Sequence, residues 1–327
     1  MKIRVKTLTA ALLAASALSV TVASAQDYPT QPVTIVVPFA AGGPTDTVTR
    51  LVAAAMSDEL GQQVVVQNVG GAGGTLGAGQ VAAAANDGYT LLLHHIGMST
   101  APALYASLPF DPMTDFAPIG LVTEVPMTVV ARRDFEPANL TDLIAYIQEN
   151  GENITYANAG IGAASQLCGL LIMDALDTKM TEVPYQGTGP AMTDLLGGQI
   201  DMMCDQTTNT TSQIQAGEIK AYAVTTPERI AVLPDLPTLA EGGLDNFNLS
   251  IWHGLYAPAG TDQAIIDRLT AALQAALANE TVGNAFAELG TYPVPADQAT
   301  SAALAQTLEG QIGLWKEVIS AAGVSAQ

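Results

Sequence analysis

The sequence is poor in positive charge. It contains 11 Lys and Arg against 31 Asp and Glu in 327 residues, which gives a formal net charge of −20. Nucleic-acid-binding proteins carry a basic surface, so this shortage excludes that class of function. An anionic membrane surface would also repel the chain. The excess of acidic residues predicts a protein that stays dispersed in solution.

Histidine is scarce as well, and the three His residues do not form a metal-binding pattern. His94 and His95 are adjacent, and His253 has no Cys, Asp or Glu at ligand spacing. A zinc site needs three or four protein ligands, so we predict no metal site. The GxSxG, SxxK and HExxH motifs are absent too. The sequence therefore predicts no catalytic residue and no enzyme.

A glycine-rich segment at residues 68–79 could suggest a dinucleotide cofactor. Its Gly73, Gly77 and Gly79 form a GxxxGxG spacing. A GxGxxG pattern counted from Gly71 fails at Leu76, and no acidic residue ends a following strand at the spacing that contacts a ribose. We therefore interpret this segment as a close-packed loop and helix start, and we expect no cofactor.

Long apolar runs are lacking except near the N-terminus. Lys2, Arg4 and Lys6 precede an apolar stretch at 8–22, and a small-x-small signal follows at 23–25. This pattern predicts a signal peptide over residues 1–25, cleaved near Ala25, and hence a periplasmic protein. The run is shorter than the ~20 residues of a membrane span, so we expect no membrane insertion of the mature chain. Cleavage would leave eight basic and 31 acidic residues, a charge near −23.

Only two cysteines are present, Cys168 and Cys204. In a reducing compartment they would be two buried thiols. In an exported chain an even number of cysteines favours a disulfide. We predict the bridge, with two free thiols as the alternative.

Strand-like apolar runs alternate with helical patterns along the chain, which predicts βαβ units and sheets covered by helices on both faces. The first block has predicted strands at 33–37, 64–66 and 89–93 and helices at 45–60 and 76–85. The second block and the chain end have strands at 125–130, 154–156, 181–183, 199–203, 220–224 and 251–256 and helices at 140–150, 165–176, 190–196, 263–279 and 300–321. No low-complexity linker separates the blocks. We expect an α/β protein with two lobes connected by strands.

Three glycine-rich turns lead from a predicted strand into a predicted helix, at 39–46, 158–165 and 186–190. Glycine lets the backbone approach a ligand closely, and Pro44 and Pro190 suit a first helical turn. The free N–H groups at a helix start attract an anion. One such turn is ordinary in any α/β protein. Three of them at the carboxyl ends of strands, where open α/β sheets bind ligands, predict a binding site.

None of the eight basic residues beyond the predicted leader lies in these turns; they are Arg50, Arg132, Arg133, Lys179, Lys220, Arg229, Arg268 and Lys316. We expect Arg50 to pair with Asp46, four residues before it on the same helix. An anionic ligand must then be held by backbone N–H groups, hydroxyls and water. Charge-assisted contacts of this kind contribute roughly 1–3 kcal/mol each.

Two further strand ends carry polar side chains. His95, Met98 and Ser99 follow the strand at 89–93, where they are candidates for lining a cleft. Asp205 and Gln206 follow the strand at 199–203, and Asp205 could accept a hydrogen bond from a ligand hydroxyl or amine. A buried helix cap or a hinge pair is the alternative role for Asp205.

With these residues in view, the whole chain resembles the Bug-type receptors, the periplasmic binding proteins of tripartite tricarboxylate transporters. The resemblance is carried by Tyr28-Pro29 and by the segments 37–46 (VPFAAGGPTD), 71–74 (GAGG), 183–191 (VPYQGTGPA), 194–201 (DLLGGQID), 233–238 (LPDLPT) and 257–261 (APAGT).

The resemblance implies a two-lobed periplasmic binding protein of type II-like fold that closes over its ligand. One lobe would hold residues 27–124 plus 252–327 and the other 125–251. It implies a small carboxylate solute bound partly through water, a membrane permease of one large and one small subunit as partner, and a monomeric receptor. The expected ligand-binding residues are Phe39, Ala40, Ala41, Gly42, Gly43, Asp46, His95, Met98, Ser99, Ala159, Gly160, Gly162, Ala163, Ser165, Gln186, Asp205 and Gln206.

The sequence departs from the family pattern at two places. His94 and His95 stand where Gly and a small hydroxyl residue are usual, and residues 204–208 replace a more apolar strand end. We expect these positions to set specificity. A ligand sensor for a two-component system and, with less support, a secreted α/β enzyme are the alternative functions.

Overall fold

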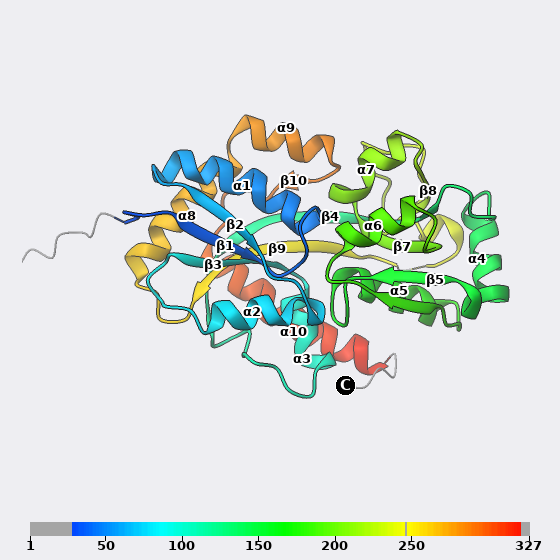
Figure 1. Ribbon diagram of the computed structural model, residues 1–327, viewed down its shortest axis with the longest axis horizontal. Coiled ribbons are helices and arrows are strands. Elements are labelled where there is room, and N and C mark those ends of the chain that lie inside the picture. Colours follow the sequence, from blue (N-terminus) through cyan, green and yellow to red (C-terminus); the bar gives the residue numbers. More distant parts are fainter. Residues whose placement is uncertain (1–27, 246, 322–327) are drawn as a thin grey trace, which may run out of the picture.

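Two extended strands cross the middle of the molecule and join two α/β lobes (Figure 1). The computed structural model describes residues 28–245 and 247–321, so the predicted signal peptide lies outside the described residues. Strand β4 (Phe116–Arg132) pairs with β9 (Ser250–Pro258) along residues 116–126 and with strands of the other lobe along residues 127–132. The change of partners makes β4 the connection between the lobes.

The first lobe has a mixed sheet in the order β2-β1-β3-β9-β4. Strands β1, β2 and β3 are parallel, β9 runs antiparallel to β3, and β10 is added at β4. The bounds are β1 Val33–Val37, β2 Val64–Asn68, β3 Thr90–His95 and β10 Tyr292–Pro293, with helices α1 Pro44–Leu60, α2 Thr75–Ala82, α3 Gly97–Leu104, α8 Gln263–Leu277, α9 Glu280–Glu288 and α10 Ser301–Ala321.

Helices cover both faces of this sheet, as the continuous apolar runs predicted. Leu91 and Leu93 pack with α1 and α8 on one face. Leu92, which points the opposite way in the strand, packs with α2, α3 and α10 on the other. Burial of both faces fixes the carboxyl edge of the sheet, and therefore the loops that leave it, in one position.

The second lobe continues the sheet in the order β4-β7-β5-β6, with β8 also paired to β4. Strands β5, β6 and β7 are parallel. The bounds are β5 Thr155–Asn158, β6 Thr181–Pro184, β7 Met202–Gln206 and β8 Ile219–Val224, with helices α4 Leu140–Asn150, α5 Ala164–Ala175, α6 Thr188–Leu196 and α7 Thr207–Gln215. Three short 3₁₀ turns lie at Ala72–Gly74, Gly151–Asn153 and Ala240–Gly242.

The alternation of strands and helices is confirmed, although several elements differ from the sequence prediction. The strand predicted at 199–203 is Met202–Gln206, and the one predicted at 125–130 is the end of the longer β4. Helices α3, α7 and α9 were not predicted. The segment of α7 is rich in threonine, a poor helix former, and four of its threonines are buried by the surrounding lobe. Tertiary packing therefore overrides local propensity there.

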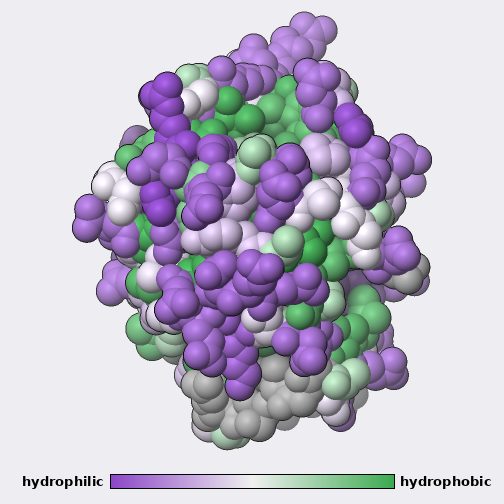
Figure 2. All heavy atoms as spheres, turned by 90° about the vertical axis from the view of Figure 1, so that its right-hand side faces the viewer, coloured by the Kyte–Doolittle hydropathy of each residue, from purple (hydrophilic) through white to green (hydrophobic). Residues whose placement is uncertain are grey.

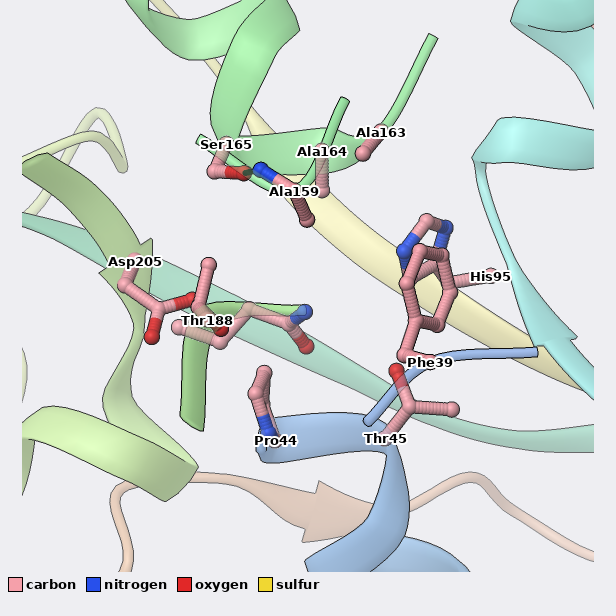
Figure 3. A pocket seen from close by; sticks show the side chains of 11 residues that line it. Phe39, Pro44, Thr45, His95, Ala159, Ala163, Ala164, Ser165, Thr188 and Asp205 are labelled. Carbon is pink, nitrogen blue, oxygen red and sulfur yellow. Dashed lines mark hydrogen bonds between the residues drawn. The ribbon is translucent and has the colours of Figure 1, made fainter. Parts of the chain in front are cut away.

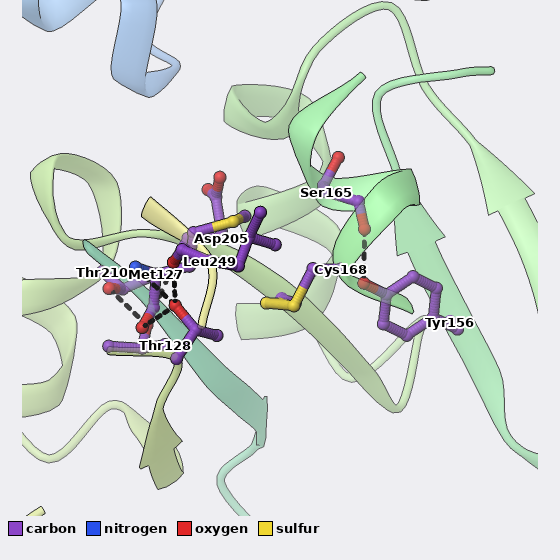
Figure 4. The surroundings of a disulfide bond; sticks show 10 residues. Met127, Thr128, Tyr156, Ser165, Cys168, Asp205, Thr210 and Leu249 are labelled. Atoms are coloured by element: carbon purple, nitrogen blue, oxygen red, sulfur yellow. Dashed lines mark hydrogen bonds between the residues drawn. A yellow bond between two sulfur atoms is a disulfide. The ribbon is translucent and has the colours of Figure 1, made fainter. Parts of the chain in front are cut away.

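The predicted disulfide is confirmed. Cys168 of α5 and Cys204 of β7 are bonded, with their Cα atoms 6.1 Å apart (Figure 4). Beside the bond, the Tyr156 hydroxyl donates to the carbonyl of Ser165 at 2.6 Å. The bridge thus joins two elements of the second lobe that reach the edge facing the first lobe.

The surface at the far end of the second lobe is mainly hydrophilic, with hydrophobic residues exposed in smaller areas between polar ones (Figure 2). Of the helices in the described residues, none combines the length and apolar character of a membrane span. The largest apolar cluster runs through both lobes, since it includes Leu92 of the first lobe and Leu167 of the second, and each lobe has a further cluster of its own.

Candidate functional site

The cavity between the lobes is formed by the three predicted turns and the ends of β3 and β7 (Figure 3). Its enclosed volume is about 10 Å³, roughly the room that one water molecule needs, so the two lobes lie tightly against each other around it. Because both lobes contribute to it, a solute bound here would hold them together. Its lining residues are Phe39, Pro44, Thr45, His95, Ala159, Ala163, Ala164, Ser165, Thr188, Asp205 and Gln206.

Two helix starts face this cavity from opposite lobes. Pro44 and Thr45 open α1, and Ala164 and Ser165 open α5. Neither helix has a side-chain cap, so the N–H groups of the first turn keep no capping partner. These groups and the helix dipoles favour an anion between them.

Ser165 is a hydrogen-bond donor toward the cavity. Its Oγ accepts from the backbone N–H of Ala159 at 2.9 Å, and the side chain is buried. The hydroxyl proton is not used in that bond and is available to an acceptor. The Tyr156 bond to the Ser165 carbonyl holds the start of α5 in place.

Phe39 and His95 form one wall of the cavity. Their rings stack with centroids 4.6 Å apart, and the His94 ring meets Phe39 edge-on. His95 Nδ1 accepts from the N–H of Gly97 at 3.0 Å, which leaves the proton of the neutral ring on Nε2. His95 can therefore donate a hydrogen bond from Nε2, and it lines the cavity as expected.

All three histidines are uncharged at neutral pH. Burial, with a smaller contribution from a neighbouring His, lowers the pKa of His94 to about 3. Burial also lowers the pKa of His253 to about 3 and that of His95 well below its usual value. Since no Lys or Arg lines the cavity either, the protein supplies no positive side chain to a bound anion.

Asp205 is the one ionisable acid among the residues that line the cavity. Its carboxylate is 1% exposed and accepts from the Thr188 hydroxyl at 3.0 Å and from Asn209 Nδ2 at 2.6 Å. Burial raises the pKa of Asp205 to about 6, although these hydrogen bonds oppose the shift. In the described part of the chain, none of the ion pairs includes Asp205.

The sequence left two roles open for Asp205, a ligand contact and a helix cap or hinge residue, and the structure has contacts that fit each of them. Asn209, on the first turn of α7, donates to its carboxylate, although the N-cap position itself is Gln206. Thr128 of β4 donates to the Asp205 carbonyl at 3.2 Å, which ties it to the connecting strand (Figure 4). The carboxylate nevertheless faces the cavity (Figure 3).

Asp46 supports the first turn from outside the cavity lining. It accepts from the N–H of Gly42, from Asn68 Nδ2 and from Arg50 Nε, all at 2.9 Å, so the predicted pair with Arg50 is confirmed. Asn68 also donates to the Phe39 carbonyl. These bonds shape the turn that carries Phe39.

The other predicted residues lie around the cavity rather than in its wall. Ala40, Gly160 and Gln186 line a neighbouring interlobe hollow of about 730 Å³. Ser99 is fully buried and donates to the Ile96 carbonyl, and Met98 beside it is also fully buried. Ala41, Gly42 and Gly43 belong to the first turn but do not line the cavity. Ala41 and Gly42 are exposed, and Gly43 is buried.

Four lining residues were not among the predicted ligand contacts: Pro44, Thr45, Ala164 and Thr188. All four fall inside the three turns that the sequence singled out. The turn pattern was therefore sufficient to find the segments. It could not show which residue of each segment points inward, because that depends on the angle at which each helix leaves its strand.

The two lobes are in contact across the cleft beside the cavity. The Ala40 N–H donates to the Gln186 carbonyl at 2.9 Å, and the Tyr105 hydroxyl donates to the Ile161 carbonyl at 2.8 Å. The Thr100 hydroxyl donates to the Gly162 carbonyl at 2.7 Å, which places Gly162 in the interlobe contact. These hydrogen bonds hold the two lobes against each other.

No group of three potential metal-ligating side chains occurs within residues 28–245 and 247–321. The arrangement that remains is a small, cation-free cavity between two lobes, with helix starts on two sides and one carboxylate.

Comparison with known proteins agrees with this geometry. A sequence model of the tripartite tricarboxylate transporter family receptor matches residues 48–324. A relative from Agrobacterium vitis, named for its position in the TAR-I ttuE-ttuC′ intergenic region, is 58% identical over 92% of this chain and 88% of its own length.

Two solved structures are similar throughout. The periplasmic binding protein BugD is 51% identical with a TM-score of 0.90, over 92% of this chain and 100% of its own. MatC from Rhodopseudomonas palustris, solved with bound malate, is 42% identical with a TM-score of 0.87, over 89% of this chain and 100% of its own. These relatives are solute-binding proteins, not enzymes. By its sequence and its two-lobed fold, the chain belongs to the family of tripartite tricarboxylate transporter receptors.

Proposed function

We propose that this protein is a periplasmic receptor that captures a small carboxylate-bearing solute between its lobes and delivers it to a membrane permease of one large and one small subunit. The observation that carries the proposal is the pair of uncapped helix starts, α1 and α5, that face one cavity from opposite lobes. A carboxylate between them would receive N–H groups from both lobes. Binding would then favour the closed arrangement, because only that arrangement brings both sets of donors together.

The absence of a cation from the cavity lining is compatible with carboxylate binding. Oriented backbone N–H groups, the Ser165 hydroxyl and His95 Nε2 supply donors without a salt bridge. The malate in the similar MatC structure supports a carboxylate as the solute class.

We also propose the lobe boundaries expected from the sequence, 27–124 plus 252–327 and 125–251. The support is the exchange of β4 partners, from β9 up to Pro126 to β7 and β8 from Met127 onward. A rotation about the two crossing strands would open the cleft. Export after removal of residues 1–25, and action as a monomer, complete the proposed function.

The test is a thermal-melt screen of the mature protein against mono-, di-, tri- and aromatic carboxylates, followed by calorimetry on the compounds that stabilise it. Ligand binding to the folded state raises stability by about 2.7 kcal/mol at 100 times Kd, which gives a clear shift in Tm. We expect one or a few stabilising compounds. Failure of every class of carboxylate would contradict the proposal.

A further inference from the structure

A pocket separate from the cavity lies on the opposite face of strand β9. Trp252 of β9 is paired with Glu124 of β4, and both line this pocket, which we call the Trp252 pocket. His253, the next residue of β9, points the other way, because successive side chains of a strand alternate between its faces. Its Nε2 contacts the Thr45 hydroxyl of the cavity wall at 3.3 Å. The Trp252 pocket and the cavity share no lining residue.

The Trp252 pocket has the size of a ligand site. Its volume is about 480 Å³, within the range of about 300–1,000 Å³ that is typical of such sites. Strand β9 and helix α10 of the first lobe supply part of its wall. Helix α5 and the segment before β9, which belong to the second lobe, supply the rest. An occupant would therefore contact both lobes.

The wall of the Trp252 pocket is rich in aromatic and aliphatic side chains. Trp252 and Trp315 are each 6% exposed, and Phe247 beside them in the lining is half-buried. Leu314 of α10 also lines the pocket and is 46% exposed, although it is a large apolar side chain. An apolar surface of this kind favours an occupant with an apolar body.

The two tryptophans differ in their hydrogen bonds. Trp315 Nε1 donates to Gln311 Oε1 at 2.9 Å. Trp252 Nε1 is buried and has no acceptor in the described part of the chain. Indole N–H groups usually find a partner when they are buried, and buried donors without one are uncommon. The wall of the pocket thus contains a polar contact that these residues leave open.

The charges around the Trp252 pocket have one sign. Glu124 of β4, Asp174 of α5 and Asp245 line it and are exposed, and they come from three separate segments. Within residues 28–245 and 247–321, none of the ion pairs includes them. The lining contains no Lys, Arg or His, and Lys316 of α10 lines a different groove. Such a pocket attracts a cation and repels an anion.

We propose that the Trp252 pocket binds a small organic cation, which carries an ammonium group on an apolar body. The body lies against Trp252, Trp315 and Phe247, and the ammonium group lies among the carboxylates. Aromatic faces attract cations as well, tryptophan most strongly. This site goes beyond the proposed function, because it is a different pocket and takes a ligand of the opposite charge.

Tryptophan fluorescence reports directly on this pocket, because the chain has two tryptophans and both line it. The mature protein is titrated with phenethylamine, 2-phenylethanol and phenylacetate, which share a phenyl ring and a two-carbon chain but are cationic, neutral and anionic. We expect phenethylamine to change the emission saturably and to bind about tenfold more tightly than the alcohol, because only the cation gains from the carboxylates and the rings. Phenylacetate should bind more weakly than both.

Two outcomes of this titration would overturn the proposal. One is binding of the alcohol or the anion that is as tight as that of the amine. The other is the absence of any saturable change with phenethylamine, which would mean that the pocket is only space left between the lobes.

The variant Glu124→Gln tests whether the charge acts locally. It removes the carboxylate paired with Trp252 and keeps the size of the side chain, so it should weaken phenethylamine about 3- to 5-fold and leave 2-phenylethanol unchanged. The matched control is Glu149→Gln, since Glu149 is an exposed residue of α4 outside the pocket and its loss changes the net charge equally. This control should bind both probes as the wild type does. An equal loss of amine binding in the two variants would show that only the overall charge attracts the amine, which contradicts the site.

Discussion

Asp205 lowers the stability of the empty protein at neutral pH. Its pKa is raised from 3.8 to about 6 by burial, so between these values the folded state binds its proton more tightly than the unfolded state. This tighter proton binding stabilises the folded state below pH 4, and that stabilisation is lost as the pH rises through 6. At 1.36 kcal/mol per pKa unit, the loss is about 2–3 kcal/mol.

Replacing Asp205 by Asn should therefore raise the free energy of unfolding at pH 7.5 by about 2–3 kcal/mol more than it does at pH 4. Asn keeps the shape and an acceptor oxygen for Thr188 but cannot ionise. Urea unfolding of wild type and variant at the two pH values measures the difference. A stability difference that does not change with pH would show that Asp205 is not destabilised by ionisation. Such a loss of stability is a common compromise at functional sites.

Asp201 should behave in the opposite way. Burial would raise its pKa, but hydrogen bonds from the Thr155 N–H and hydroxyl and from Arg132 outweigh burial and lower it. Its stabilisation is present at neutral pH and is lost as the pH falls through the lowered pKa. Asp201→Asn should cost about 1–3 kcal/mol at pH 7.5 and less at pH 3, in the same unfolding assay. A variant that is as stable as the wild type at pH 7.5 would contradict this account.

Substitutions at Ser165 and Ser99 give a second comparison between a residue in the cavity wall and a control outside it. Both hydroxyls are buried, but Ser165 lines the cavity, whereas Ser99 donates to the Ile96 carbonyl outside it. Ser165→Ala should weaken the binding of any carboxylate ligand about tenfold, because one donor to the anion is lost. Ser99→Ala should leave affinity unchanged. Calorimetry with a ligand from the screen makes the comparison, and equal affinities for both variants would remove Ser165 from the site.

At the scale of elements, the loop between β2 and α2 controls how closely the lobes approach. A Cβ at Gly73 would overlap the Ile161 carbonyl oxygen of the other lobe, and the residue has a positive φ of 63°. The expectation of a close-packed loop for this glycine-rich segment is confirmed, and the close packing is against the opposite lobe. Only glycine allows both the backbone conformation and the approach.

Gly73→Ala should keep the cleft from closing fully and weaken ligand binding tenfold or more, since the closed state would be less populated. The control is Gly61→Ala, which has a similar φ of 67° but no neighbour within 4 Å of the added Cβ. That variant should lose about 1 kcal/mol of stability and keep its affinity. Calorimetry and small-angle scattering with and without ligand provide the readouts. Equal affinity of the two variants would contradict the role of Gly73 in closure.

The Cys168–Cys204 bridge joins two elements that carry cavity residues, α5 with Ser165 and β7 with Asp205. It closes a loop of 36 residues, for which chain entropy gives about 3–4 kcal/mol of stabilisation. Both elements belong to one lobe, so the bridge fixes the relative position of a donor and an acceptor without restricting closure.

For the whole molecule, much of the fold was predictable because the signals are local. Apolar runs bounded by glycine and proline placed the strands and most helices, and the two-lobed α/β class followed. Three helices were missed, and in one of them, the threonine-rich α7, local preference opposes the structure. The connecting strand β4 was predicted only in part, because its 17 residues serve two lobes with different partners.

The site was predictable to the level of segments. The three turns all reach the cavity, and Phe39, His95, Ala159, Ala163, Ser165, Asp205 and Gln206 were named in advance among its lining residues. The inward direction of Thr45 and Thr188 was not, because it depends on how two lobes from distant parts of the chain meet. The neutral state of the histidines likewise results from burial that no local pattern shows.

The sequence by itself determined the chemistry available to this protein: few cations, two cysteines, glycine turns at strand ends and no catalytic motif. These properties depend on residue type and short-range geometry, which the chain carries in every conformation. Only the tertiary structure decided that α1 and α5 point their starts at one cavity, and that Asp205 is buried there without a partner cation. Both results require residues more than a hundred positions apart to meet. The two crossing strands place the lobes side by side, and the glycine turns let their backbones approach closely.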